Sequence, residues 1–190
     1  MRFFIPMKSH PIKRIAVFCG SATGSDPAFR QTCIDLAGIF QTHRIAMVYG
    51  GGNIGLMGIL ADEMLRLGGE VIGVIPKKLV DIELAHNGLT HLHIVPGMHE
   101  RKALMASLSD AFIVLPGGIG TMEEFFEMYT WLQLGYHDKP LALLNINGFY
   151  NMLIGFLDHI VQQGFFQRSR FEQLIIDDHP ADLVNRIIKS

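Results

Sequence analysis

A glycine-rich stretch with two carboxylates, residues 116–124, reads PGGIGTMEE and has the composition of an anion-binding bend. Glycines let the backbone turn tightly with its N–H groups exposed, and a helix that follows adds partial positive charge at its first turn. Phosphate fits such a bend. The stretch lacks the Gly-Lys-Ser/Thr ending of a P-loop, so no lysine is available for a β- or γ-phosphate, and the pattern indicates a monophosphate.

Thr121 and Glu124 have a second interpretation, because their spacing is that of a helix capping box. In a capping box the hydroxyl and the carboxylate satisfy backbone N–H groups of the first turn, and no ligand is needed. However, a carboxylate beside a phosphate site is unfavourable unless a cation compensates, and structure alone rarely requires that arrangement. Both interpretations stay open at this point.

A candidate cation comes from residues 98–102, which read MHERK at the start of a predicted helix. We expect Arg101 and Lys102 to lie near the same sheet edge as Glu124. The alternative is a solvated basic pair on a helix surface, which is common for adjacent arginine and lysine. Placement beside the anion-binding bend is what favours a functional role.

A second glycine stretch, residues 50–55, reads GGGNIG between a predicted strand and a predicted helix, as in a dinucleotide-binding fingerprint. A dinucleotide site also needs an acid about 20 residues further on, to hold the ribose hydroxyls. Residues 73–76 read GVIP there and contain no carboxylate. NAD and FAD are therefore not expected, and the stretch is interpreted either as a tight turn with close helix–strand packing or as a phosphate or sugar contact.

The elements that must position these residues alternate along the chain. Apolar runs predict strands over residues 14–19, 45–49, 71–75, 91–95, 111–115, 141–144 and 174–176. Helices are predicted from Pro27, with Ser25 or Asp26 as its cap, and over residues 54–67, 98–109, 122–134, 150–163 and 180–188. Strands that are apolar on both faces and separated by helices are typical of a parallel sheet covered on both sides.

The predicted fold class is therefore α/β: a doubly wound, Rossmann-like parallel sheet of about seven strands with helices on both faces. We expect a single nucleotide-binding domain over residues 1–190, with 1–12 as an N-terminal extension. Ligands of such open sheets bind at the carboxyl ends of the strands, where both glycine stretches fall.

Composition narrows the function classes. The 190 residues are 49% hydrophobic and 18% charged, which excludes disorder. Sixteen basic against eighteen acidic side chains give a net charge of −2, so nucleic acid is not an expected partner. No apolar run approaches the ~18 residues of a membrane span. Cys19 and Cys33 suffice for neither a disulfide framework nor a metal quartet, and we expect a soluble protein of the reducing cytosol.

No metal or organic cofactor is expected. His91 and His93 lie on one strand face, but two ring nitrogens without a third ligand more often reflect packing. Met47, Met57 and Met64 are interpreted as core residues.

Six segments together resemble the LONELY GUY (LOG) family of cytokinin riboside 5′-monophosphate phosphoribohydrolases, whose members are often labelled lysine decarboxylase. They are FCGS at 18–21, YGGG at 49–52, GLMG at 55–58, MHERK at 98–102, SDAF at 109–112 and PGGIGTMEE at 116–124. The similarity runs from about residue 13 to residue 165 and includes WLQLG at 131–135 and HDKP at 137–140. A decarboxylase would need pyridoxal phosphate and a Schiff-base lysine, for which the sequence has no recognisable site.

The resemblance implies that Arg101 and Glu124 form the catalytic pair and that the bend holds the 5′-phosphate. It further implies substrate contacts from Glu83, Lys102, Gly117, Gly118, Ile119, Gly120, Thr121, Met122, Glu123 and Thr130. Around Glu83 the chain reads DIEL, which departs from the basic context common in the family, and Ile119 stands where plant members usually carry tyrosine.

The implied reaction is hydrolysis of the N-glycosidic bond of an adenine-type nucleoside 5′-monophosphate, either cytokinin riboside 5′-monophosphate or AMP, to free base and ribose 5-phosphate. A carboxylate near the anomeric carbon can stabilise the oxocarbenium-like transition state and either position water or attack directly. The alternative is a non-catalytic carrier or sensor of a nucleotide or of molybdenum cofactor on the same fold.

The resemblance also implies a homodimer with active sites near its interface, built by the helix that bears Tyr129, Trp131 and Leu132. The other interpretation is that this helix is buried within one chain.

Overall fold

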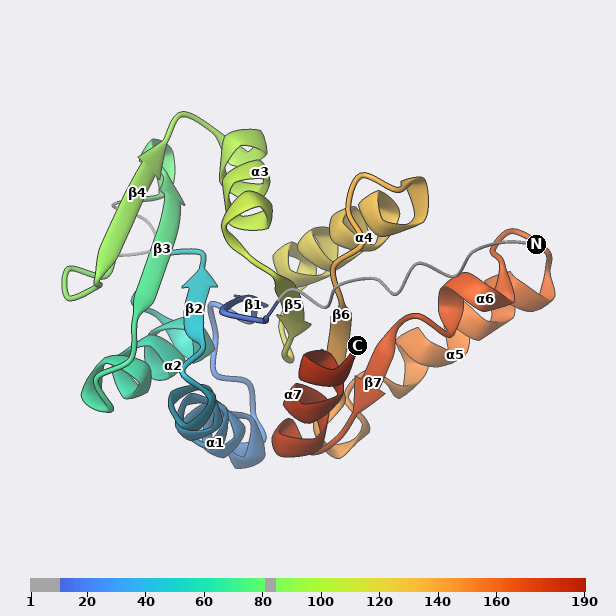
Figure 1. The fold of residues 1–190 in the computed structure, drawn as a ribbon, viewed down its shortest axis with the longest axis horizontal. Coiled ribbons are helices and arrows are strands. Elements are labelled where there is room, and N and C mark those ends of the chain that lie inside the picture. Colours follow the sequence, from blue (N-terminus) through green and yellow to red (C-terminus); the bar gives the residue numbers. More distant parts are fainter. Residues whose placement is uncertain (1–10, 81–84) are drawn as a thin grey trace.

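The structure, a computed structural model, describes residues 11–80 and 85–190. At its centre is a seven-stranded sheet in the order β4-β3-β2-β1-β5-β6-β7, and every neighbouring pair is parallel (Figure 1). The strands are β1 (Arg14–Phe18), β2 (Ala46–Tyr49), β3 (Val71–Pro76), β4 (His91–Val95), β5 (Ala111–Val114), β6 (Leu141–Leu144) and β7 (Ile175–Asp177). The predicted doubly wound α/β fold is confirmed.

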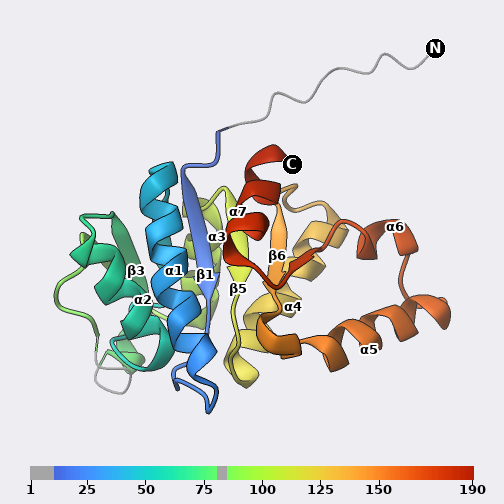
Figure 2. The same cartoon turned by 90° about the horizontal axis from the view of Figure 1, so that it is seen from below.

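Helices cover both faces of the sheet. They are α1 (Pro27–His43), α2 (Gly55–Arg66), α3 (Met98–Leu108), α4 (Ile119–Leu134), α5 (Asn151–Gln162), α6 (Arg168–Phe171) and α7 (Pro180–Lys189), with short 3-10 turns η1 (Lys77–Leu79) and η2 (Ile146–Gly148). Helices α1, α2 and α7 lie on one face and α3 and α4 on the other, while α5 reaches beyond the sheet (Figures 1 and 2). Among the described residues, no helix combines the length and apolar character needed to cross a membrane.

Each face of the sheet buries its own apolar cluster. The cluster under α1, α2 and α7 includes Met47, Met57 and Met64, which confirms their predicted place in the core. The cluster under α3, α4 and α5 includes Phe125 and Leu157. Two-sided burial explains why the central strands are apolar at nearly every position, Arg14 at the exposed start of β1 excepted.

Most predicted boundaries lie within one or two residues of those observed, and three features differ. Helix α4 begins at Ile119 rather than at residue 122, because the glycine bend itself enters the helix. Helix α6 has only four residues, too few to show a helical period in the sequence. Strand β4 lies at the sheet edge, and there His91 and His93 are exposed, so the interpretation that they reflect packing was wrong.

The strand order reverses between β1 and β5. From β1 the chain adds β2, β3 and β4 on one side and then returns to place β5, β6 and β7 on the other. The loops after β1 and β5 therefore part at the carboxyl edge, the position at which doubly wound sheets bind their ligands. Both glycine stretches, residues 50–55 and 116–120, lie at this edge.

Of the two predicted caps of α1, Ser25 and Asp26, the structure has Asp26. Its Oδ1 accepts a hydrogen bond from the Ala28 N–H at 2.8 Å, and Pro27 occupies the first helical position. The other carboxylate oxygen accepts from Asn147 Nδ2 at 2.8 Å. The bonds from Asn147 and Ala28 lower the pKa of Asp26 below its ordinary value. Asp26 thereby joins the loop after β6 to the loop after β1.

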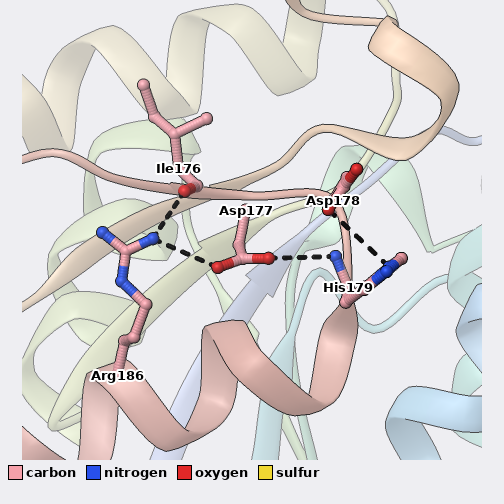
Figure 3. A network of polar contacts seen from close by, with 5 residues as sticks. All are labelled: Ile176, Asp177, Asp178, His179 and Arg186. Carbon is pink, nitrogen blue, oxygen red and sulfur yellow. Dashed lines mark hydrogen bonds and ion pairs between the residues drawn. The ribbon is translucent and has the colours of Figure 1, made fainter.

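A polar network attaches the C-terminal helix to the edge strand β7 (Figure 3). Arg186 Nη1 donates to the Ile176 carbonyl at 2.6 Å and lies 3.1 Å from Asp177 Oδ2. The other oxygen of Asp177 accepts from the His179 N–H at 3.2 Å, and His179 Nδ1 lies 3.7 Å from Asp178 Oδ1. These contacts explain how a three-residue strand holds a helix whose apolar residues complete the core.

His137 makes folding stability depend on pH. Its Nδ1 accepts from the Lys139 N–H at 3.1 Å, so the ring proton lies on Nε2, which donates to the Met128 carbonyl at 3.0 Å. Burial, assisted by the charge of Lys139 and opposed by the bond to Met128, lowers the pKa of His137. Between this lowered pKa and the ordinary value near 6.5 the unfolded chain binds the extra proton, so stability is full above pH ~6.5 and is lost on acidification.

We expect His137→Gln to lose less stability than the wild type when the pH falls from 7 to 5, because glutamine cannot take up a proton. Chemical denaturation at the two pH values measures the difference. His91→Gln, at an exposed position of β4, is the control and should behave like the wild type. Equal acid sensitivity of His137→Gln and the wild type would contradict this assignment.

Candidate active site

Three loops at the carboxyl edge are in direct backbone contact. The Gly20 N–H donates to the Pro116 carbonyl at 3.1 Å, and the Gly20 carbonyl accepts from the Leu56 N–H at 3.0 Å. A Cβ at Gly20 would lie 2.9 Å from the Ala22 carbonyl oxygen, and a Cβ at Gly55 would lie 2.3 Å from the Ser21 carbonyl carbon. Gly20 and Gly55 are therefore required by close backbone packing, which supports the tight-turn interpretation of residues 50–55.

The bend before α4 has no side-chain cap among the described residues. Gly118 is the N-cap residue, and the first helical hydrogen bond runs from the Met122 N–H to the Gly118 carbonyl at 3.1 Å. Thr121 is thus the third helical residue, and the capping-box interpretation was wrong. The N–H groups of the first helical turn before Met122 do not take part in the helical hydrogen bonds. Such groups bind side chains, water or anions.

The surface of this bend is open. Gly118 and Gly120 are exposed, and a Cβ at either position would meet no atom within 4 Å. The Ile119 side chain between them is 86% exposed. Thr121 differs, because it is only 4% exposed and its Oγ1 would lie 2.1 Å from a Cβ at Gly117. The backbone of the bend therefore faces solvent, while Thr121 supports it from below.

Arg101 lies inside the protein. It is 5% exposed, and its Nη2 donates to the Gly50 carbonyl at 3.2 Å, at the end of β2. A Cβ at Gly50 would lie 1.9 Å from that nitrogen, so the absence of a side chain at position 50 makes room for the guanidinium. The interpretation of Arg101 and Lys102 as a solvated surface pair was wrong, since Lys102 is also 5% exposed.

Glu124 lies one helical turn beyond the bend, on α4, and is half-buried. The negative charge of its carboxylate influences the pKa of the Cys19 thiol, which directly follows β1. Burial first, and then the neighbouring Cys33 and Glu124, raise the pKa of Cys19 well above its ordinary value. Glu124 interacts with Cys19, which follows β1, and Arg101 binds the carbonyl of Gly50, which follows β2. Because β1 and β2 are neighbours, both interactions fall at adjacent strand ends of the same edge. This edge therefore combines a carboxylate, a guanidinium and an open anion-binding bend.

Lys102 bridges α3 and α4. Its Nζ lies 2.5 Å from Glu123 Oε1 and 3.0 Å from Glu127 Oε2. Burial lowers the pKa of Lys102, but the hydrogen bonds and charges of Glu123 and Glu127 outweigh burial and raise it above its ordinary value. Lys102 is therefore a charged ammonium that holds the start of α4 against α3. Glu127 is not among the predicted site residues, although its i,i+4 spacing from Glu123 places both acids on one helix face.

We expect Lys102→Met to lower the free energy of unfolding by about 2 kcal/mol, because Glu127 stays partly buried after losing its cation. Urea denaturation measures the change. Lys189→Met, on the exposed end of α7, should change stability by less than about 0.5 kcal/mol. An unchanged midpoint in Lys102→Met would show that the bridge contributes no stability.

Other predicted site residues are not gathered here. Thr130 is exposed and lies about 14 Å along the α4 axis from Thr121. Met122 is partly buried against the core between the sheet and α4. Glu83 lies outside the described residues. Over residues 11–80 and 85–190, no group of three or more histidine, cysteine, aspartate or glutamate side chains has the arrangement of a metal site.

Comparison with known proteins identifies the family of this chain. The family model described as "Possible lysine decarboxylase" matches residues 57–187. Cytokinin riboside 5'-monophosphate phosphoribohydrolase LOG3 of Arabidopsis thaliana is 43% identical over 181 residues, which are 95% of this chain and 84% of that protein. The corresponding phosphoribohydrolase of Rhodococcoides fascians is 46% identical over 165 residues, 86% of this chain and 83% of that protein. The chain belongs to the LOG family.

The LOG fold also resembles that of a solved carrier protein. The molybdenum cofactor carrier protein of Chlamydomonas reinhardtii superimposes with a TM-score of 0.69 over 94% of this chain and 99% of that one, at 17% identity. This likeness shows a common fold. Lys102, the buried lysine at this edge, does not support the decarboxylase description of the family model. It is the charged partner of two carboxylates, whereas a Schiff base forms from a neutral amine.

Proposed function

We propose that this chain hydrolyses the N-glycosidic bond of adenine-type nucleoside 5′-monophosphates, cytokinin riboside 5′-monophosphate or AMP, to free base and ribose 5-phosphate. The observation that carries the proposal is the open bend at Gly118–Gly120 on the edge that holds Arg101 and Glu124. Identity of 43% and 46% to two phosphoribohydrolases supports the same reaction.

In this proposal the bend binds the single 5′-phosphate through backbone N–H groups at the positive end of α4. Lys102 does not add a second cation for further phosphates, because its charge is taken up by Glu123 and Glu127. A monophosphate therefore suits the charge of the site better than a triphosphate.

Glu124 and Arg101 are the proposed catalytic pair. As the bond between C1′ and the base nitrogen breaks, positive charge develops on the ribose, and a carboxylate near C1′ stabilises it. Water adds its oxygen to C1′. One of its protons stays on the new hydroxyl, and the other is transferred, directly or through solvent, to the departing base. Guanidinium groups do not act as proton donors at ordinary pH, so the role proposed for Arg101 is to orient Glu124 or the leaving base.

Incubation with AMP and with isopentenyl-AMP tests the proposal. We expect free base and ribose 5-phosphate in equal amounts, detected by chromatography, and comparison of kcat/KM for the two nucleotides identifies the preferred base. Tight binding of AMP without release of adenine would instead favour the alternative of a non-catalytic carrier.

We propose further that the chain forms a homodimer with active sites near the interface. Helix α5 supports this, because Leu157 is its only fully buried residue, while Met152 is 87% and Phe156 is 56% exposed. Apolar surface of this kind commonly marks a protein interface. Thr130, exposed on α4, is a substrate contact by resemblance, and a second copy could bring it to a site that it does not reach within its own chain.

We expect the mass in solution to correspond to two chains, and Phe156→Glu to shift it to one. Ile188→Glu, on α7 at the opposite sheet face, is the control and should leave the mass unchanged. A fully active monomeric wild type would contradict shared active sites.

A cytosolic location is part of the same proposal. Cys19 and Cys33 are buried free thiols, which a reducing compartment preserves. Fractionation of cells that produce the protein should place it with cytosolic markers, and recovery with an oxidising compartment would contradict the proposal.

A further inference from the structure

We propose that His86 and Asp62 form a clamp that positions the Gly50–Gly52 loop and, through this loop, the guanidinium of Arg101. The functional consequence rests on the proposed function, in which Arg101 belongs to the catalytic pair. Neither residue of the clamp contacts the anion-binding bend, so both are positioning residues. The clamp joins α2, the segment before β4 and the loop after β2.

The side chain of His86 uses both ring nitrogens. Its Nδ1 accepts a hydrogen bond from the Gly88 N–H at 3.0 Å, which places the ring proton on Nε2. Nε2 lies 3.0 Å from Asp62 Oδ1, on α2, and donates to it. His86 is 7% exposed, whereas the Asp62 side chain is 68% exposed. The imidazole is therefore held in one orientation by a bond from each side.

The backbone around His86 holds the glycine loop. The His86 N–H donates to the Gly51 carbonyl at 3.0 Å, and Ala85 forms an antiparallel bridge with Gly52. On the other side of the loop, Arg101 Nη2 donates to the Gly50 carbonyl at 3.2 Å. The clamp and Arg101 thus bind two consecutive carbonyl groups of one loop.

A loop of three glycines needs such external contacts, because glycine has more backbone freedom than any other residue. Gly51 adopts a left-handed conformation with φ of +78°. Rotation about its backbone would turn the adjoining peptide groups, including the carbonyl that accepts from Arg101. His86, tied to α2 through Asp62, restricts that rotation, and this restriction is the function we assign to the clamp.

Two substitutions at Asp62 test the clamp with little risk to folding, because this side chain is largely exposed. We expect Asp62→Ala to lower the kcat of AMP hydrolysis about fivefold to tenfold, the loss expected for one hydrogen bond. The KM should stay within about twofold, because the phosphate binds at the separate bend before α4. Asp62→Asn keeps an oxygen that accepts from Nε2 and should restore kcat to within about twofold of the wild type.

Substitution of His86 by asparagine provides a second, independent test of the clamp. The amide oxygen of asparagine can replace Nδ1 as acceptor for the Gly88 N–H, but the shorter side chain cannot reach Asp62. His86→Asn should therefore match Asp62→Ala. The double variant should lose no more activity than either single one, because the two residues act through one bond. Additive losses would overturn the proposal.

A readout that does not depend on catalysis completes the test. Because Arg101 is buried, its Nε–H should exchange slowly with solvent in NMR spectra of the wild type. We expect Asp62→Ala to speed this exchange at least fivefold and Asp62→Asn to leave it nearly unchanged. Unchanged exchange in Asp62→Ala would overturn the clamp. If the wild type releases no base from AMP, the proposed function fails, and the exchange rates still decide whether the clamp positions Arg101.

Discussion

Glu124→Gln is expected to lower the kcat of base release about 10³-fold, because glutamine fills the same space without the negative charge that stabilises an oxocarbenium-like transition state. The protein should fold normally, since Glu124 is only half-buried and lies within the regular part of α4. AMP should still bind, because the backbone of the bend at Gly118–Gly120 is unchanged. Single-turnover assays with AMP and equilibrium binding measure the two effects separately.

Glu172→Gln, at the exposed C-terminal end of α6, is the matched control and should retain the wild-type kcat. Full activity of Glu124→Gln would remove this carboxylate from the mechanism. Loss of AMP binding together with activity would show instead that Glu124 serves the phosphate site, and would also contradict the proposed role.

Gly50→Ala is expected to lower kcat about 100-fold although it adds only a single methyl group, outside the bend, since displacement of a catalytic group by about 1 Å can cost that much. The new Cβ would lie 1.9 Å from Nη2 and 3.1 Å from Cζ of Arg101. The long arginine side chain can move aside, so most of the strain is relieved by displacement of the guanidinium from the Gly50 carbonyl. The effect should therefore fall on activity more than on stability, and assays at saturating AMP together with thermal unfolding separate the two.

Gly38→Ala is the matched control, because position 38 lies in α1 and an added Cβ there meets no atom within 4 Å. It should leave kcat unchanged and stabilise the helix by about 0.5–1 kcal/mol. If Gly50→Ala keeps the wild-type kcat while a crystal structure shows Arg101 displaced, the position of the guanidinium is not needed for the reaction.

The amino-acid sequence by itself determines the fold class and predicts the sheet edge at which we propose the site. Short apolar runs separated by helix-like segments require a parallel sheet with both faces covered, and such a sheet binds ligands at its carboxyl edge. Residues 98–102 and 116–124 fall at helix starts on that edge, and their motifs are those of the LOG family. These properties follow from local composition and spacing, which the sequence displays directly.

The tertiary structure alone decides what each of these side chains contacts. By sequence alone, Thr121 could either cap a helix or follow a bend. In the structure α4 begins at Ile119, which excludes the cap. By sequence alone, Arg101 could be solvated. In the structure it is buried and donates to the carbonyl of Gly50, 51 positions away in the chain. The contacts of Lys102 and of His86 likewise join segments separated in sequence. Spacing along the chain predicts which element a residue belongs to, whereas pairing between elements depends on how the sheet and helices pack.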